Sequence, residues 1–189
     1  MKETIQGMFL IRWSIVAALF MLALINLNSA LYLGMVWPIW MCGYGQFLCS
    51  RAGVARLLPL ISLVAPLGAT LFLFGAQHQS PLYKLTEPLM YAVGGYQDWM
   101  LMNLCAIPAG GLLYLIFLYR LGRYVQRPDL CRQCLVMILV PGASAIALAV
   151  LPNSGLPWAF YLLIANTLVF PIAVSRLMLR LVKAIPAES

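Results

Sequence analysis

A long stretch without charged side chains constrains this chain more than any other feature. Residues 13–50 contain no Asp, Glu, Lys or Arg and are mostly apolar. A helix needs about 20 apolar residues to cross a bilayer, so this stretch is too long for one crossing and long enough for two short ones. Polar residues at 26–29 provide a turn. The stretch therefore predicts two helices embedded in lipid.

The composition extends this interpretation to the whole chain. Hydrophobic residues make up 63% of the 189 residues, charged residues make up 9%, and the mean hydropathy is +0.93. Roughly a quarter of the residues in an average soluble domain are charged. We therefore expect a chain that is solvated mainly by lipid. The predicted fold is all-α, a polytopic transmembrane bundle that forms a single membrane-embedded domain over residues 1–189.

Prolines, glycine pairs and polar clusters divide the chain into six helices in three hairpins, because such residues mark turns. Pro38 and Pro66 predict bends in the second and third helices, since proline removes a backbone donor. The segment 77–98 carries prolines and several aromatic rings, so we expect it to lie along the membrane surface and to be partly helical. The predicted helices cover residues 10–27, 30–49, 57–76, 99–119, 135–151 and 158–177.

The basic residues predict the orientation of such a bundle. With both termini in the cytoplasm, all twelve Lys and Arg residues except Lys84 fall on the inner side. This is the bias that positive-inside topology requires. It predicts a multi-pass protein of the bacterial inner membrane, N-in and C-in, and explains the net charge of +7 without direct binding of nucleic acid. A bundle of four spanning helices with residues 13–49 as a re-entrant hairpin keeps the same charge assignment and stays open.

The segment RLGRYVQRPDLCRQC, residues 120–134, concentrates arginine between two apolar stretches. Arg120, Arg123 and Arg127 are three or four residues apart and share one face if the fourth helix continues that far. Such clusters attract anionic lipid, and an acidic protein surface would suit them equally well. Together with Arg132 they predict a docking site for a cytoplasmic protein partner or for anionic lipid.

Cys131 and Cys134 form a Cys-x-x-Cys pair in the same segment. The spacing resembles that of the quinone-linked membrane thiol oxidases, and nearby arginines favour a thiolate. That family uses its pair on the periplasmic side with a second cysteine pair, whereas the orientation here places both thiols in the reducing cytoplasm. A thiol site is therefore the disfavoured interpretation. His78 is the only histidine and falls on the opposite side, so we predict neither a metal nor a cofactor.

Neutral residues inside the predicted helices favour packing over chemistry. Small residues let membrane helices approach closely, and amides form hydrogen bonds between them, so we assign Asn103, Gly142, Ser144 and Asn166 to helix packing. No charged residue occupies the middle of a predicted helix, which disfavours proton-driven transport.

These patterns predict a non-enzymatic inner-membrane subunit. It would form a homo-oligomer in the bilayer and dock a cytoplasmic partner through its basic inner loops, as in a secretion, conjugation or phage-defence assembly. A small substrate-binding transporter subunit is the alternative, and it would enclose a polar cavity near Asn103 and Asn166. A membrane-bound lipid or thiol enzyme is disfavoured because the sequence offers no acid, base and metal constellation.

Overall fold

The computed structural model describes residues 1–25, 34–51, 53–76, 81–92, 94–150 and 157–185. Within these ranges every regular element is a helix and none is a strand, which confirms the all-α class. The helices are α1 (Lys2–Ile25), α2 (Val36–Ser50), α3 (Leu57–Ile61), α4 (Val64–Ala76), α5 (Pro81–Ala92), α6 (Tyr96–Tyr124), α7 (Pro128–Val150) and α8 (Pro157–Ala184). The predicted third helix corresponds to α3 and α4 together.

Several helices extend beyond the apolar runs that predicted them. The first helix begins at Lys2 instead of residue 10, the fourth continues to Tyr124, and the last continues to Ala184. Apolar runs mark the part of a helix that faces lipid or core, and a helix that carries polar residues continues past that part until its caps. Arg123 and Lys183 lie in the last turns of α6 and α8, where a positive charge interacts favourably with the negative end of the helix dipole.

The fifth predicted helix begins earlier than expected. Its apolar run starts at residue 135, whereas α7 starts at Pro128. Proline suits the first position of a helix because its missing N–H has no partner there, and Asp129 next to it favours the positive end of the helix dipole. As a result Cys131, Arg132 and Cys134 lie in the first turns of a helix and not in a loop.

The two prolines that predicted bends have different effects. Pro38 lies in the first turn of α2, where proline breaks no hydrogen bond. The third predicted helix is interrupted at residues 62–63, one turn before Pro66. Pro66 has no N–H to donate to the carbonyl of Ser62, four residues earlier, and that carbonyl accepts from Ala65 at 3.0 Å instead. The interruption therefore falls where the proline's missing hydrogen bond would have ended.

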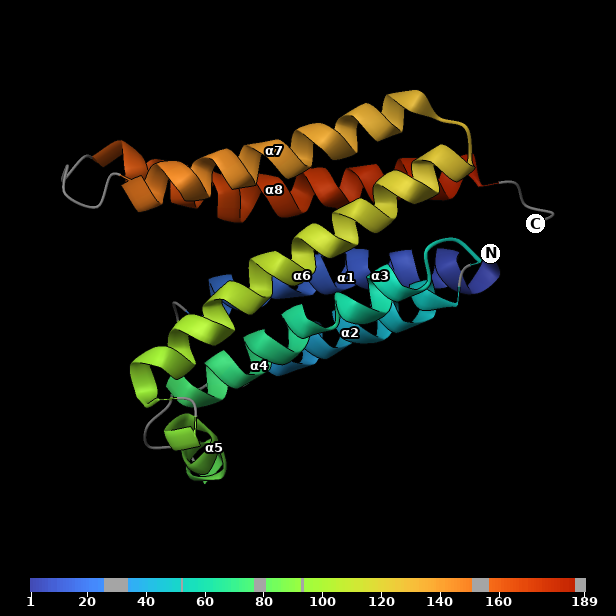
Figure 1. Cartoon of the computed structure of the whole chain (residues 1–189). Helices are drawn as coiled ribbons and strands as arrows, with labels where there is room; N and C mark the ends of the chain where they lie inside the picture. The colour runs from blue at the N-terminus through green and yellow to red at the C-terminus, as the bar shows by residue number, and fades with distance from the viewer. Residues whose placement is uncertain (26–33, 52, 77–80, 93, 151–156, 186–189) are drawn as a thin grey trace.

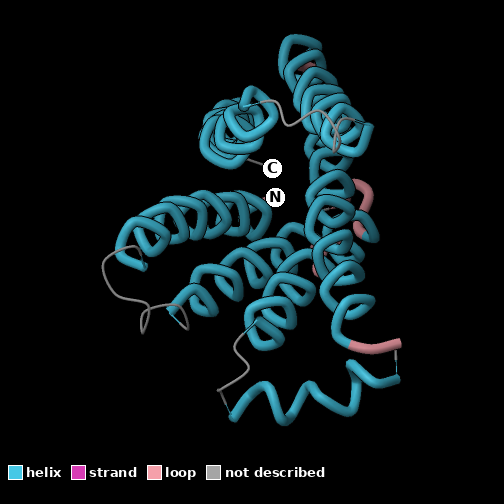
Figure 2. The backbone as a smooth tube through the Cα atoms, turned by 90° about the vertical axis from the view of Figure 1, so that its left-hand side faces the viewer, coloured by secondary structure: helices cyan, strands magenta, loops and turns pink. Residues whose placement is uncertain are grey.

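The long helices run back and forth between two ends of the molecule (Figures 1 and 2). The start of α1, the end of α6, the start of α7 and the end of α8 share one end, which we call the basic end because most of the lysines and arginines lie on these segments and on the turns that join them. The helices α7 and α8 pair along one side, α2 and α4 lie on the other side of α6, and α1 packs against both α2 and α8. The short helix α5 lies across the opposite end.

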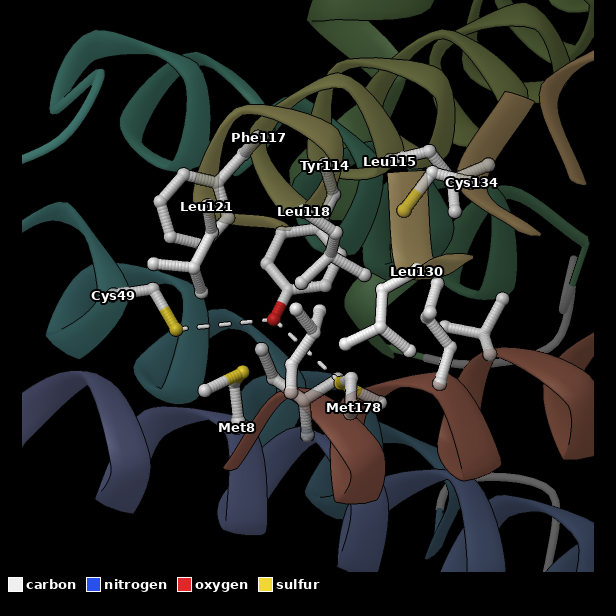
Figure 3. Close-up of a cluster of buried hydrophobic side chains, with 14 of the residues drawn as sticks. Met8, Cys49, Tyr114, Leu115, Phe117, Leu118, Leu121, Leu130, Cys134 and Met178 are labelled. Carbon is white, nitrogen blue, oxygen red and sulfur yellow. Dashed lines mark hydrogen bonds between the residues drawn. The ribbon is translucent and has the colours of Figure 1, made fainter. Parts of the chain in front are cut away.

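The buried core lies toward the basic end and joins α1, α2, α6, α7 and α8 (Figure 3). Its members are mainly leucine, methionine and aromatic side chains that are almost fully buried. They are Met8, Ile11, Cys49, Tyr114, Leu115, Phe117, Leu118, Leu121, Leu130, Cys134, Val174, Leu177, Met178, Leu181 and Ile185. This packing fixes the position of the segment where α6 meets α7.

Length and hydropathy single out one helix as a candidate membrane span within the described residues. It covers Lys2–Met21 with a mean hydropathy of 1.5, and the shorter apolar stretch Leu57–Leu71 covers α3 and the start of α4. The buried helix of a soluble protein or a signal sequence passes the same test. The number of crossings therefore stays a prediction.

Candidate functional site

The turn between α6 and α7 has a backbone conformation that its sequence does not predict. The N–H of Arg127 donates to the carbonyl of Gly122 at 3.0 Å, and the N–H of Gln126 donates to the carbonyl of Arg123 at 3.1 Å. This pair of hydrogen bonds is a Schellman motif, which usually places glycine at the left-handed position. Here Gln126 occupies that position with φ +56°. The turn leaves residues 125–127 as the only connection between the two helices.

An open groove lies at this corner, with a volume of about 480 Å³. Tyr119 and Arg123 form the α6 wall, Gln126 lies in the turn, and Pro128 and Cys131 form the α7 wall. The Cys131 thiol donates to the carbonyl of Tyr119 at 3.7 Å and so connects the two walls. We call this the corner groove; it is lined by Tyr119, Arg123, Gln126, Arg127, Pro128 and Cys131.

Arg127 is held in place by a neighbouring carboxylate. Its Nε and Nη2 atoms donate to the two oxygens of Asp129, each at 2.9 Å. These hydrogen bonds from the Arg127 guanidinium hold the pKa of Asp129 below its usual value. No described carboxylate forms an ion pair with Arg123, the other arginine of the groove. The groove therefore presents one paired and one unpaired guanidinium, a set suited to binding an anion.

The four arginines predicted as a docking site divide into two groups. Arg123 and Arg127 line the corner groove, whereas Arg120 and Arg132 are exposed at the same end without lining it. Three further groove residues were not predicted from the sequence: Tyr119, Gln126 and Pro128. No residue type in that stretch predicts a left-handed turn, because glutamine rarely adopts this conformation.

A second basic group on α8 was also missed. Arg176, Arg180 and Lys183 are exposed, and their spacing of four and three residues places them on one helical face. That spacing is readable from the sequence alone. It was attributed only to orientation, although the end of α8 lies beside the end of α6 (Figure 1).

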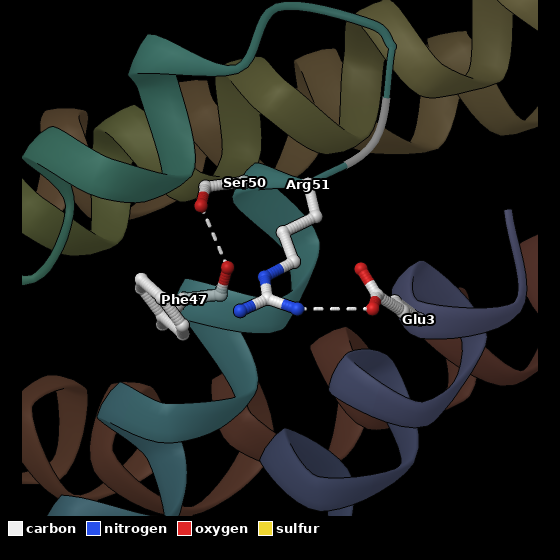
Figure 4. A network of polar contacts seen from close by, with 4 residues as sticks. All are labelled: Glu3, Phe47, Ser50 and Arg51. Atoms are coloured by element: carbon white, nitrogen blue, oxygen red, sulfur yellow. Dashed lines mark hydrogen bonds and ion pairs between the residues drawn. The ribbon is translucent and has the colours of Figure 1, made fainter.

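The remaining basic corner, between α1 and α2, is neutralised internally (Figure 4). The Nη1 atom of Arg51 donates to Glu3 at 3.0 Å, and the Arg51 guanidinium lies 5.2 Å from the centre of the Phe47 ring. This ion pair connects the start of α1 to the end of α2. Arg51 is therefore less available to a ligand than the arginines of α6, α7 and α8 that form no ion pair within the described ranges.

The cysteine pair is placed as core rather than as a reactive site. Cys131 and Cys134 are both buried and unbonded to other cysteines. Burial raises the pKa of the Cys131 thiol, which disfavours the reactive thiolate. A third thiol, Cys49, lies on the far side of Tyr114 from Cys134 and contacts the Tyr114 hydroxyl at 3.8 Å (Figure 3). No metal-binding group of three His, Cys, Asp or Glu side chains occurs in the described part of the chain.

The residues assigned to helix packing cannot be placed in the same detail. Asn103 belongs to α6, Gly142 and Ser144 belong to α7, and Asn166 belongs to α8. Their side chains lie outside the described part of the chain. The packing roles and the polar cavity expected of a transporter subunit therefore stay predictions.

No family model, curated protein or solved structure matches the chain. The site is therefore interpreted from its own geometry and chemistry.

Proposed function

We propose that the chain is a non-enzymatic, integral subunit of the bacterial inner membrane that docks a cytoplasmic partner through its basic end. One observation carries the proposal. Most of the lysines and arginines lie on segments that meet at the basic end and are exposed, whereas Lys84 lies on α5 at the opposite end. This asymmetry is what a six-helix bundle with both termini in the cytoplasm requires.

Exposed apolar side chains support a lipid environment for the lateral surface. A soluble monomer rarely exposes large continuous apolar patches. Here large apolar side chains, including three tryptophans, are exposed on several helices. Exposed examples are Trp13, Phe20, Trp37, Trp40, Leu57, Ile61, Leu67 and Leu139.

Charge supports docking of a partner with an acidic surface. Arg120, Arg132 and the α8 group at residues 176–183 are exposed and form no ion pair within the described residues. A concentrated positive surface speeds the approach of an acidic partner and disfavours basic ones. A subunit of this kind fits a secretion, conjugation or phage-defence assembly, in which a membrane component recruits a soluble one.

An aromatic stripe on α2 is the surface we assign to oligomerisation. Trp37, Trp40, Tyr44 and Phe47 follow the three-and-four spacing of a coiled-coil seam. The first three are 65%, 54% and 58% exposed, and the Tyr44 and Phe47 rings stack with centroids 6.5 Å apart. A second copy of the chain would cover this stripe by packing α2 against α2.

Two measurements test the proposal. Alkaline carbonate should leave the full chain in the membrane fraction, and release of the chain would overturn membrane integration. Soluble proteins that copurify with the chain at low salt should be lost when Arg120 and Arg132 are both changed to glutamate. The matched control is Lys84→Glu at the opposite end, which should retain them. Loss of the same proteins in both variants would contradict docking at the basic end.

A further inference from the structure

We propose that the corner groove binds the phosphodiester headgroup of an anionic phospholipid in the inner leaflet. The inference rests on the proposed membrane insertion and adds to it a specific ligand site. It concerns the residues that line the groove and not the outer basic residues assigned to the protein partner.

Arginine donors at the groove suit a phosphate group. Arg123 is exposed and has no carboxylate partner among the described residues. Arg127 uses two of its donors on Asp129. A guanidinium has five N–H donors, so about three remain for a ligand. Planar guanidinium groups bind phosphate oxygens through paired hydrogen bonds, and a guanidinium already fixed by Asp129 loses less conformational entropy on binding.

The turn adds a neutral donor beside the two arginines. Gln126 lines the groove and holds a left-handed conformation that is costly for a residue other than glycine, by about 1–2 kcal/mol. Strained backbone of this kind concentrates at ligand sites. Glutamine at this position supplies a side-chain amide to the groove, and glycine would give the same turn without it. The strained backbone and the side-chain donor of the groove therefore belong to the same residue, Gln126.

An apolar row below the groove favours a lipid over a soluble anion. From Cys131, α7 continues at intervals of four residues to Leu135 and Leu139, which are 45% and 68% exposed. On α6, Leu112 lies two turns before Tyr119 and is also exposed. These leucines are positioned to contact an acyl chain whose headgroup lies in the groove. A free phosphate or an acidic peptide would make no use of them.

The position of the groove along the helices agrees with this assignment. The apolar runs predicted to span the bilayer end at residue 119 on α6 and begin at residue 135 on α7, so the groove lies at the headgroup level. Tyr119 lines the groove and Tyr124 is exposed beside it. Tyrosine is enriched at that level because its ring is apolar and its hydroxyl is polar.

Native mass spectrometry of the full chain in a neutral detergent tests the proposal. The probes are dioleoyl phosphatidylglycerol and dioleoyl phosphatidylcholine, which share acyl chains and differ in net charge. We expect one phosphatidylglycerol to bind in preference. Arg123→Gln should weaken that binding about tenfold, in line with the loss of a hydrogen bond to a charged group. Arg132→Gln removes an exposed arginine outside the groove and should change it less than about twofold.

One further variant and two competing ligands distinguish a lipid site from the other possible ligands. Arg123→Lys keeps the charge and loses the planar donors, so it should give intermediate binding, and size-exclusion profiles check that each variant is folded. Equal weakening by Arg123→Gln and Arg132→Gln would overturn the proposal in favour of general charge attraction. Equal binding of both lipids would also overturn it. Full displacement of phosphatidylglycerol by inorganic phosphate would assign the groove to a soluble anion instead, and displacement by polyglutamate alone would assign it to an acidic protein.

Failure of this inference is distinguishable from failure of the proposed function. If carbonate releases the chain from membranes, membrane integration fails first. If the chain stays in the membrane and phosphatidylglycerol shows no preference, only the lipid site is wrong. Partner docking is measured through Arg120 and Arg132, which do not line the groove.

Discussion

Gly7 and Gly45 bring the backbones of α1 and α2 into direct contact. A Cβ atom added to Gly45 would lie 2.6 Å from the carbonyl oxygen of Gly7 and 2.6 Å from Cγ1 of Ile11. A Cβ atom added to Gly7 would meet the carbonyl oxygen of Gly45 just as closely. Small residues allow this approach between membrane helices, and here the approach fixes the N-terminal hairpin beside the Glu3 to Arg51 ion pair.

Alanine at this contact should destabilise the fold. We expect Gly45→Ala to lower the free energy of unfolding by about 1–3 kcal/mol, because the new methyl group overpacks a contact between two backbones. Denaturant titration in detergent measures the change. Gly111→Ala on α6 is the matched control, since a Cβ atom there meets nothing within 4 Å. Equal effects of the two substitutions would contradict close packing at Gly45.

Glycine at the α6–α7 turn should stabilise the chain. Gln126→Gly is expected to raise the free energy of unfolding by about 1 kcal/mol, because glycine adopts φ +56° without strain. Gln126→Ala keeps the strained position and removes the side chain, so its stability should stay close to wild type. Thermal unfolding of wild type and of the two variants measures these differences in stability. A glycine variant less stable than the alanine variant would exclude the left-handed turn.

The Arg127 to Asp129 ion pair predicts a dependence of stability on pH. The pKa of Asp129 is lower in the folded chain than its usual 3.8, so its contribution is present above 3.8 and is lost as the pH falls through the folded value. Asp129→Asn should therefore differ from wild type in melting temperature at neutral pH and converge with it at low pH. Arg127→Gln should remove the same dependence. A difference in melting temperature between Asp129→Asn and wild type that stays constant from neutral to low pH would show that the ion pair does not affect stability.

Truncation of the aromatic stripe on α2 should weaken self-association. We expect Trp40→Ala combined with Tyr44→Ala to weaken dimerisation about tenfold or more, because aromatic residues at the centre of an interface contribute most of its energy. Native mass spectrometry at several protein concentrations measures the shift. Leu139→Ala, at an exposed residue of α7, is the control. An unchanged oligomer distribution in the α2 variant would place the interface elsewhere.

The sequence predicts the all-α class and the order of the long helices because apolar periodicity and breakers report on both. It does not predict local geometry where one residue acts on another some distance away. Pro66 shows this, since the helix is interrupted at residues 62–63, where the proline's hydrogen bond would have ended. Helix ends are missed for a related reason, because polar turns beyond a predicted span carry no apolar signal.

The corner groove was only half predictable. Its arginines stand out by charge and spacing in the sequence. Its shape depends on the left-handed conformation of Gln126 and on the start of α7 at Pro128, which together bring Cys131 against Tyr119. Leu130 is buried in the core four residues after Gln126, so tertiary packing favours this conformation where the local preference of glutamine does not. Such a site becomes visible only when the turn is seen in three dimensions.

Because only residues 125–127 connect α6 to α7, a rotation at this joint would displace the far end of α7 more than its start. With a rise of 1.5 Å per residue, the helix Pro128–Val150 reaches about 35 Å from this joint to the opposite end of the molecule. A rotation of about 5° at the joint therefore carries the far end of α7 about 3 Å sideways. A ligand bound between Arg123 and Pro128 would act at this joint, so a small rotation at the basic end would produce a larger displacement at the opposite end of α7.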